Sequence, residues 1–292
     1  MKTYFVCSDI HSFYTEWMQC LKQAGFKKNN PEHILIICGD IFDRGTQPLE
    51  IYKFLKALPK ERRILIKGNH EYLLKELFDR KYSLYHDKHN GTEDTICYLS
   101  KQLTESQFDT ETFKLLSEEL SVNDYMDFIK QRDKDNIKRI KKIYNSKKIK
   151  EIIDWIFSDE WVNYYETEHY IFVHAWFPMI GKQGYSPDYN KLKYNLNWRN
   201  STLEEWEEAS WGFPVDYYKA NCNQTGKTIV CGHWHTSDFW NELDYKNKPS
   251  KQLSIHESNI YKSEQNPDLI GLDACTVLSK RVNILVLKEN EL

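Results

Sequence analysis

Five short polar blocks, each directly after a run of apolar residues, constrain this chain more than any other feature of its sequence. In chain order the blocks are D-x-H at 9–11, G-D-x-x-D-R at 39–44, G-N-H-E at 68–71, a single histidine at 174, and G-H-x-H at 232–235. The apolar runs before them are short and β-branched, which is typical of buried strands. Open α/β sheets bind ligands in the loops at the carboxyl ends of their strands. Five such loops carrying Asp, Asn or His indicate a metal centre.

Length and composition favour one globular domain. The chain has 292 residues, 40% of them hydrophobic, so it can build a sizeable core. The five blocks are spread over almost the whole length, which favours a single domain over residues 1–292 rather than two independent ones. The net charge of −3 provides no global field that would attract nucleic acid or an anionic membrane.

The cysteines predict a reducing compartment. None of the seven forms a C-x-x-C pair, and Cys7, Cys38 and Cys231 lie inside the expected strands. This is the pattern of reduced, packed thiols, and a thiol ligand at Cys7 or Cys38 is the less favoured alternative. The chain enters its first strand without a leader, and no window approaches the roughly 18 apolar residues of a spanning helix. We therefore expect a cytoplasmic protein that does not bind membranes.

The elements are expected to alternate at first and then to change character. Strand, polar block and helix repeat three times over residues 1–80, which predicts parallel pairing with right-handed crossovers. Residues of about 82–160 are polar and have isoleucines at helical spacing, so we expect a helical insertion that caps or flanks the site. Its basic stretch, 127–150, is interpreted as a solvated helix face, with steering of an anionic substrate as the alternative.

The last part of the chain is expected to be rich in strands. Further strands are expected at 170–173, 228–231, 269–272 and 282–287, whereas 238–268 has little apolar pattern and is expected to be a long loop. Residues 204–211 are expected to form an amphipathic helix with an acidic outer face.

The donor types limit the metals. Carboxylate, carboxamide and imidazole groups together suit Mn²⁺, Fe or Zn²⁺ and suit Ca²⁺ poorly. Asp9 and His11 are two residues apart, so on an extended strand end both would point the same way. Gly232 allows the backbone to approach closely ahead of His233. Glu71 is expected to stabilise the following helix N-terminus, and Asp273 either faces the site or caps a turn.

The order and spacing of the five blocks resemble the calcineurin-like metallophosphoesterase superfamily, most closely its bacterial and phage serine/threonine phosphatase branch. The resemblance covers residues 1–80 and 165–240. It implies a four-layer α/β/β/α sandwich of two mixed sheets, here with the helical insertion. It also implies two divalent metal ions, with Mn²⁺ favoured and Fe, Zn²⁺ or Ni²⁺ left open. The implied ligands are Asp9, His11 and His235 for the first ion, Asn69, His174 and His233 for the second, and Asp40 as the bridge.

The same resemblance implies a hydrolytic mechanism. A hydroxide shared by the two ions would attack phosphorus in line. His70 would be the general acid, with Asp43 holding its imidazole charged and oriented. Arg44 would bind the phosphate in a bidentate manner. A second phosphate-binding arginine is carried over to Arg199, although relatives have a Trp-x-Arg-like segment where this chain has Trp198-Arg199.

These expectations favour a phosphomonoesterase of the protein phosphatase type, acting on a phosphoprotein, a nucleotide or a small phosphoester. The alternatives are a symmetric dinucleoside-polyphosphate hydrolase, a phosphodiesterase or nuclease, and a pseudo-enzyme that only binds a partner. The nuclease is disfavoured because the basic stretch lacks interleaved aromatic residues for base stacking. The pseudo-enzyme is disfavoured because a scaffold has no need of His70 as a general acid. The sequence predicts neither the oligomeric state nor the physiological substrate.

Overall fold

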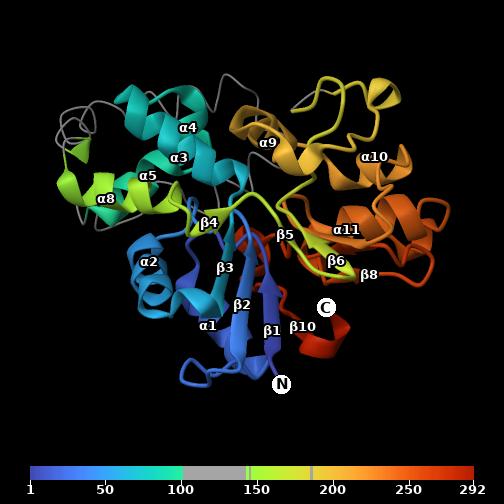
Figure 1. Cartoon of the computed structure of the whole chain (residues 1–292), viewed down its shortest axis with the longest axis horizontal. Helices are drawn as coiled ribbons and strands as arrows, with labels where there is room; N and C mark the ends of the chain where they lie inside the picture. Colours follow the sequence, from blue (N-terminus) through green and yellow to red (C-terminus); the bar gives the residue numbers. More distant parts are fainter. Residues whose placement is uncertain (101–142, 145, 185–186) are drawn as a thin grey trace.

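The computed structural model describes residues 1–100, 143–144, 146–184 and 187–292 and contains two five-stranded sheets (Figure 1). In the first sheet the order is β10-β1-β2-β3-β4, with β1 to β4 parallel and β10 antiparallel to β1. Its strands are β1 Thr3–Cys7, β2 His33–Cys38, β3 Arg63–Ile66, β4 Trp161–Val162 and β10 Leu285–Lys288.

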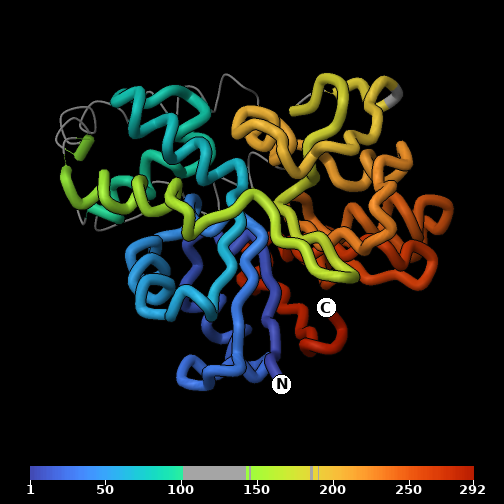
Figure 2. Tube along the Cα trace, viewed as in Figure 1, coloured from blue at the N-terminus to red at the C-terminus, as the bar shows by residue number. Residues whose placement is uncertain are grey.

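The second sheet is also mixed and has the order β5-β6-β7-β9-β8. Its central strands β6, β7 and β9 are parallel, and β5 and β8 pair antiparallel at the edges. The strands are β5 Tyr165–Glu166, β6 Tyr170–Phe172, β7 Thr228–Cys231, β9 Leu269–Gly271 and β8 Tyr261–Lys262. The chain passes from the first sheet to the second through β4 and β5, and its C-terminal segment returns to lie beside β1 (Figure 2).

The two sheets pack against each other because their strands have two apolar faces. In β1, Phe5 and Cys7 face a core beneath the outer helices, whereas Tyr4 and Val6 face a core shared with Phe172 and other residues of the second sheet. Side chains alternate across a strand, so a strand buried on both faces needs an uninterrupted apolar run. This is the composition from which the strands were predicted.

Helices cover the two outer faces (Figure 1) and complete the predicted α/β/β/α order. Those over the first sheet are α1 Tyr14–Gln23, α2 Pro48–Ala57, α3 Asn69–Arg80, α5 Thr92–Leu99 and α8 Lys147–Ile156. Those over the second are α9 Leu203–Ala209, α10 Pro214–Lys219 and α11 Thr236–Phe239. The expected acidic helix is α9, whose Trp206 is buried. Two further short helices are α4 Tyr85–His89 and α12 Thr276–Ser279.

The expected long loop at 238–268 was wrong in part. A π-helical turn, Trp240–Asp244, continues α11, and β8 adds an antiparallel strand to β9 within this segment. The buried carboxylate of Asp244 accepts hydrogen bonds from Tyr261 Oη, Ser263 Oγ and Asn266 Nδ2 at 3.1, 2.5 and 2.9 Å. Polar bonds order this segment, which is why apolar periodicity did not predict it.

The described part of the insertion is mostly helical. Its described residues carry α4, α5 and α8, and α5 contributes the buried side chains Ile96 and Leu99 to the core that α3 also joins. Residues 101–142 lie outside the described residues, and so does most of the basic stretch 127–150. The domain boundaries therefore remain a prediction. Among the described helices, none has the length and apolarity needed to cross a membrane.

Glu71 joins two of the polar blocks. Its carboxylate accepts the backbone N–H of Gly68 at 2.8 Å, as expected for the start of α3. It also accepts the N–H groups of Asp40 and Ile41, both at 3.0 Å, which lie in the loop after β2. One fully buried side chain thus fixes the loop after β2 against the loop after β3.

We predict that Glu71→Ala lowers the free energy of unfolding of the metal-free protein by about 3–5 kcal/mol, because three buried N–H groups lose their shared acceptor. Denaturant unfolding in the presence of a chelator measures this change. Glu76→Ala is the matched control: Glu76 lies on the same helix, about half exposed, in an ion pair with Arg80. The control should change stability by no more than about 0.5 kcal/mol. A loss below about 1 kcal/mol for Glu71→Ala would contradict the role of Glu71 in joining the two loops.

Candidate metal centre

The first polar block has left-handed backbone rather than an extended strand end. Strand β1 ends at Cys7, and Asp9, His11 and Ser12 have φ of 53°, 49° and 61°. The expectation of an extended strand end was therefore wrong, although the side chains of Asp9 and His11 do converge, with Oδ1 and Nε2 3.9 Å apart. The loop after β2 holds this turn, since His11 N–H donates to Asp40 O at 3.0 Å and Ser12 N–H donates to Ile41 O at 2.9 Å. Such strained backbone concentrates at functional sites.

Three polar atoms from other residues lie close to Nε2 of His174. Its Nε2 lies 2.8 Å from Asn69 Oδ1, 3.1 Å from His233 Nδ1 and 3.2 Å from Asp40 Oδ1. Its Nδ1 donates to Cys38 O at 2.9 Å, so the neutral ring presents a lone pair at Nε2. Lone pairs that converge in this way need a positive charge between them, which a proton or a divalent cation can supply.

The pKa shifts of His174 and Asp40 favour a site that binds positive charge. Burial lowers the pKa of His174, but the Asp40 carboxylate outweighs it and raises that pKa to about 9. Burial opposes ionisation of Asp40, yet the imidazoles of His174 and His70 hold the pKa of its carboxyl well below the usual range. A metal ion bound here would replace the proton that His174 otherwise attracts.

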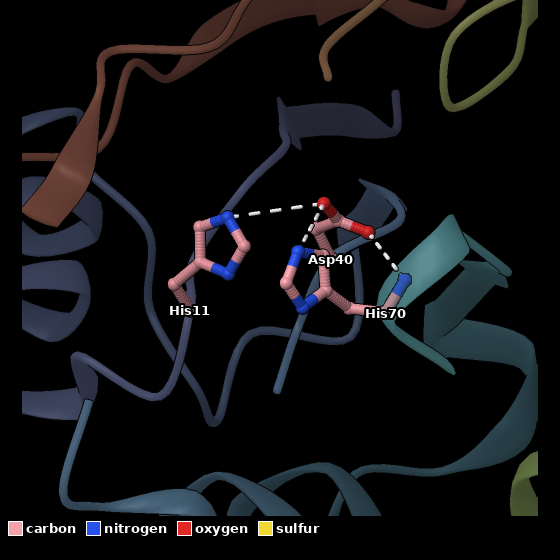
Figure 3. Close-up of side chains that lie close together, drawn as sticks. All are labelled: His11, Asp40 and His70. Atoms are coloured by element: carbon pink, nitrogen blue, oxygen red, sulfur yellow. Dashed lines mark hydrogen bonds and ion pairs between the residues drawn. The ribbon is translucent and has the colours of Figure 1, made fainter. Parts of the chain in front are cut away.

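A second group of donors shares Asp40 (Figure 3). His11 Nε2 and His70 Nε2 each lie 3.8 Å from Asp40 Oδ2, and the ligand atoms of these three residues are within 4.8 Å of one another. His11 Nδ1 donates to Phe42 O at 3.1 Å, which turns the lone pair of Nε2 toward Asp40. Asp40 thus directs one oxygen to each donor group.

Asp9 and His235 lie at the edge of these groups. Asp9 Oδ1 is 3.9 Å from His11 Nε2, and its Oδ2 accepts the His233 N–H at 3.0 Å. Burial and the nearby Asp273 raise the pKa of Asp9, and the carboxylate of Asp273 caps a turn, accepting the Cys275 N–H at 2.7 Å. His235 lines the same pocket but belongs to neither donor group among the described residues.

Gly232 has the role predicted for it. A Cβ at this position would lie 1.8 Å from Ser8 Oγ and 2.1 Å from Asp9 Oδ2. A larger residue would therefore displace the turn that carries His233.

His70 is held by a buried carboxylate. Its Nδ1 lies 2.7 Å from Asp43 Oδ2, which also accepts Thr92 Oγ1 at 2.6 Å. Arg44 reaches both rings, with NH1 3.1 Å from His11 Nε2 and NH2 3.3 Å from His70 Nε2. Since arginine only donates, His70 Nε2 accepts and its Nδ1–H donates to Asp43. Thr92 belongs to the insertion and was not predicted, because no motif marks it.

Arg199 does not join these residues. Its guanidinium donates to both carboxylate oxygens of Glu166, at 2.7 and 2.6 Å, and it stacks on Trp198. It lines a separate pocket together with Lys67 and Trp206. We therefore leave Arg199 out of the site. In this chain Trp198 and Arg199 are adjacent, whereas the Trp-x-Arg-like segment of the relatives has a residue between them.

The donor groups open into a pocket of about 210 Å³. One side carries Asp40, Arg44, Asn69, His70, His233 and His235. The other lining residues were not predicted from the sequence: they are His89, Asn90, Gly184, Tyr189, Trp211, Phe213 and Trp234. The pocket is thus polar on the metal side and largely aromatic elsewhere.

Comparison with known proteins agrees with this geometry. The family model of calcineurin-like phosphoesterases matches residues 2–237. The symmetrical bis(5'-nucleosyl)-tetraphosphatase of Buchnera aphidicola is 35% identical over 100 residues, which are 33% of this chain and 35% of the relative. The enzyme of that name from Psychromonas ingrahamii is 39% identical over 71 residues, 24% of each chain. The matches to these relatives thus span about a third of their length or less.

Solved structures support the fold. The cold-active protein-tyrosine phosphatase of a psychrophilic Shewanella species has a TM-score of 0.50 at 13% identity, covering 99% of this chain and 76% of that one. A mutant of a cold-active protein tyrosine phosphatase gives a TM-score of 0.51, with the same identity and coverage. Because the family model covers most of the sequence, this chain belongs to the calcineurin-like phosphoesterase family.

Proposed function

We propose that this chain hydrolyses phosphate monoesters, in the manner of a protein phosphatase, with two divalent metal ions that share Asp40. The observation that carries the proposal is the position of Asp40, with one carboxylate oxygen toward His174 and the other toward His11 and His70. A carboxylate placed between two donor groups is suited to bridge two ions, which phosphatases commonly hold about 3.5–4 Å apart.

The donors divide into two sets around this carboxylate. We assign Asp9, His11 and His235 to one ion and Asn69, His174 and His233 to the other. Nitrogen and oxygen donors in this mixture suit Mn²⁺, our first choice, while Fe, Zn²⁺ and Ni²⁺ are compatible with the same set. When bound, such ions activate the attacking water and neutralise charge on the phosphoryl oxygens.

The remaining residues serve the leaving group and the phosphate. As the bond between phosphorus and the ester oxygen breaks, that oxygen would take the proton of His70 Nε2, after this nitrogen has been protonated and has lost its contact with Arg44. Asp43 stabilises the imidazolium through Nδ1, and Thr92 fixes Asp43 in turn. Arg44 lies beside both His11 and His70, where its planar guanidinium can bind two phosphoryl oxygens.

His70 has a second possible role. A histidine that donates Nδ1–H to a carboxylate is also the usual arrangement of a metal ligand, and His70 Nε2 is as close to Asp40 as His11 Nε2 is. We favour the general acid, which is the role that the family resemblance implies for His70.

A symmetric dinucleoside-polyphosphate hydrolase is the second candidate. It is favoured by the relatives of that name, which are up to 39% identical to this chain over short segments. The substrate would then be a nucleotide rather than a phosphoprotein.

We predict that His70→Asn lowers kcat/KM for a phosphate monoester by about 10²–10⁴-fold, the usual contribution of a general acid, while two metal ions per chain remain. Metal content by mass spectrometry and steady-state kinetics measure the two effects. His174→Asn is the comparison, because it removes a donor and should lower metal content. Loss of metal in His70→Asn would instead identify His70 as a ligand.

A substrate panel with Mn²⁺ tests the reaction class. It contains p-nitrophenyl phosphate, bis(p-nitrophenyl) phosphate, phosphopeptides and diadenosine tetraphosphate. We expect kcat/KM for the monoester to exceed that for the bis-ester by at least about tenfold, because a monoester offers one more charged oxygen to the two ions and Arg44. Preference for the bis-ester would refute the monoesterase, and preference for the tetraphosphate would establish the second candidate.

A further inference from the structure

One side of the metal pocket is built from aromatic rings that the proposed chemistry does not use. Tyr189, Trp211, Phe213 and Trp234 line the pocket together with the metal donors, and we call these four residues the aromatic wall. Trp211 and Phe213 lie between α9 and α10, whereas Trp234 stands between the two histidines of the last polar block. Separate segments of the chain thus bring rings to one place.

The wall begins next to the metal donors. The Trp211 and Trp234 rings have their centroids 6.2 and 6.0 Å from that of His233, each nearly perpendicular to it at 87° and 88°. Phe213 packs against Trp234 with centroids 4.8 Å apart. A phosphate bound at this metal centre would therefore lie close to the aromatic rings.

Trp234 keeps a large exposed area at this position. Its side chain is 39% exposed, although the protein buries other tryptophans such as Trp176 and Trp198 almost completely. Exposed aromatic surface in a pocket with a few polar groups is typical of a ligand site. Aromatic rings also attract one another edge-to-face or offset beyond their burial, by about 0.5–1.5 kcal/mol per pair.

We propose that the aromatic wall receives an aromatic ring joined directly to the phosphate through the ester oxygen, so that the chain prefers aryl phosphates, such as a phosphotyrosine side chain, over alkyl phosphates. This inference rests on the proposed monoesterase function and names its substrate class. An ester oxygen alone separates ring and phosphorus in an aryl phosphate, which matches the short distance between the wall and His233.

The pocket size also allows a small aromatic group. Pockets that enclose drug-sized ligands usually measure about 300–1,000 Å³, so the 210 Å³ here is sufficient for a ring and a phosphate. A neighbouring hollow of about 520 Å³ shares His89, Asn90 and Trp211 with the metal pocket. It gives room for the chain of a phosphorylated peptide beyond the ring.

Inert phosphonates test this inference without turnover. Phenylphosphonate and butylphosphonate carry the same acidic group and no ester bond, and they differ in the ring. With the Mn²⁺-loaded protein, their inhibition constants come from competition against p-nitrophenyl phosphate, and quenching of tryptophan fluorescence gives their dissociation constants. We expect phenylphosphonate to bind at least about tenfold more tightly, since more than one ring of the wall contributes.

Variants then locate the effect. Trp234→Ala should reduce the ratio of the two dissociation constants about fivefold, and Trp234→Phe should keep most of it because a ring remains. Tyr82→Ala is the control: Tyr82 is 59% exposed and does not line the metal pocket, so the ratio should equal that of the parent protein. Metal content of each variant is measured, because Trp234 adjoins two proposed ligands, and only metal-replete samples are compared.

The outcomes separate this inference from the proposed function. If monoesters are hydrolysed but the two phosphonates bind equally well, or the ratio is unchanged in Trp234→Ala, the aryl preference is wrong and the monoesterase stands. If Trp234→Ala weakens diadenosine tetraphosphate alone, the wall binds a nucleobase and the inference is overturned. If no phosphate ester is hydrolysed, the proposed function fails first.

Discussion

The Asp40 carboxylate depends on contacts from both sheets, and the rest of the site is arranged around it. Its loop follows β2, and the N–H of His70 donates to Oδ1 at 3.1 Å. His174 approaches the same oxygen from the end of β6 in the second sheet. The core shared by the two sheets sets this separation, so a change in their packing would move His174 away from Asp40. The packing of the two sheets therefore also sets the distances between the donor atoms.

This arrangement requires backbone that the strands alone would not adopt. Asp9, His11, Asp40 and His233 all have positive φ, a conformation that costs roughly 1–2 kcal/mol for a residue with a side chain. Contacts between the loops hold it: Glu71 binds the loop after β2, and Asp9 accepts the N–H of His233. The polar groups that gather donors for a cation thus also stabilise the turns that carry them.

The sequence was informative where the signal is local. Apolar runs predicted the buried strands, and the polar blocks after them predicted which side chains meet, because parallel strands bring their carboxyl ends to one edge. It was uninformative where contact depends on distant segments. Thr92 reaches Asp43 from 49 residues away, and the ion pair of Arg199 with Glu166 removes that arginine from the site. The polar network of Asp244 ordered a segment that has no periodic pattern.

The residues that the sequence predicted and those that it did not predict have different chemical roles. Metal donors must sit at fixed distances, so short motifs after the strands encode them, and the family match spans those motifs. The aromatic wall lies on connecting segments that carry no motif, and loops of this kind change readily without disturbing the sheets. Trp234 is the exception, since its backbone lies between two donors while its ring lines the substrate side. In our proposal, the group attached to phosphorus is selected by side chains of this second kind, which are aromatic in this chain.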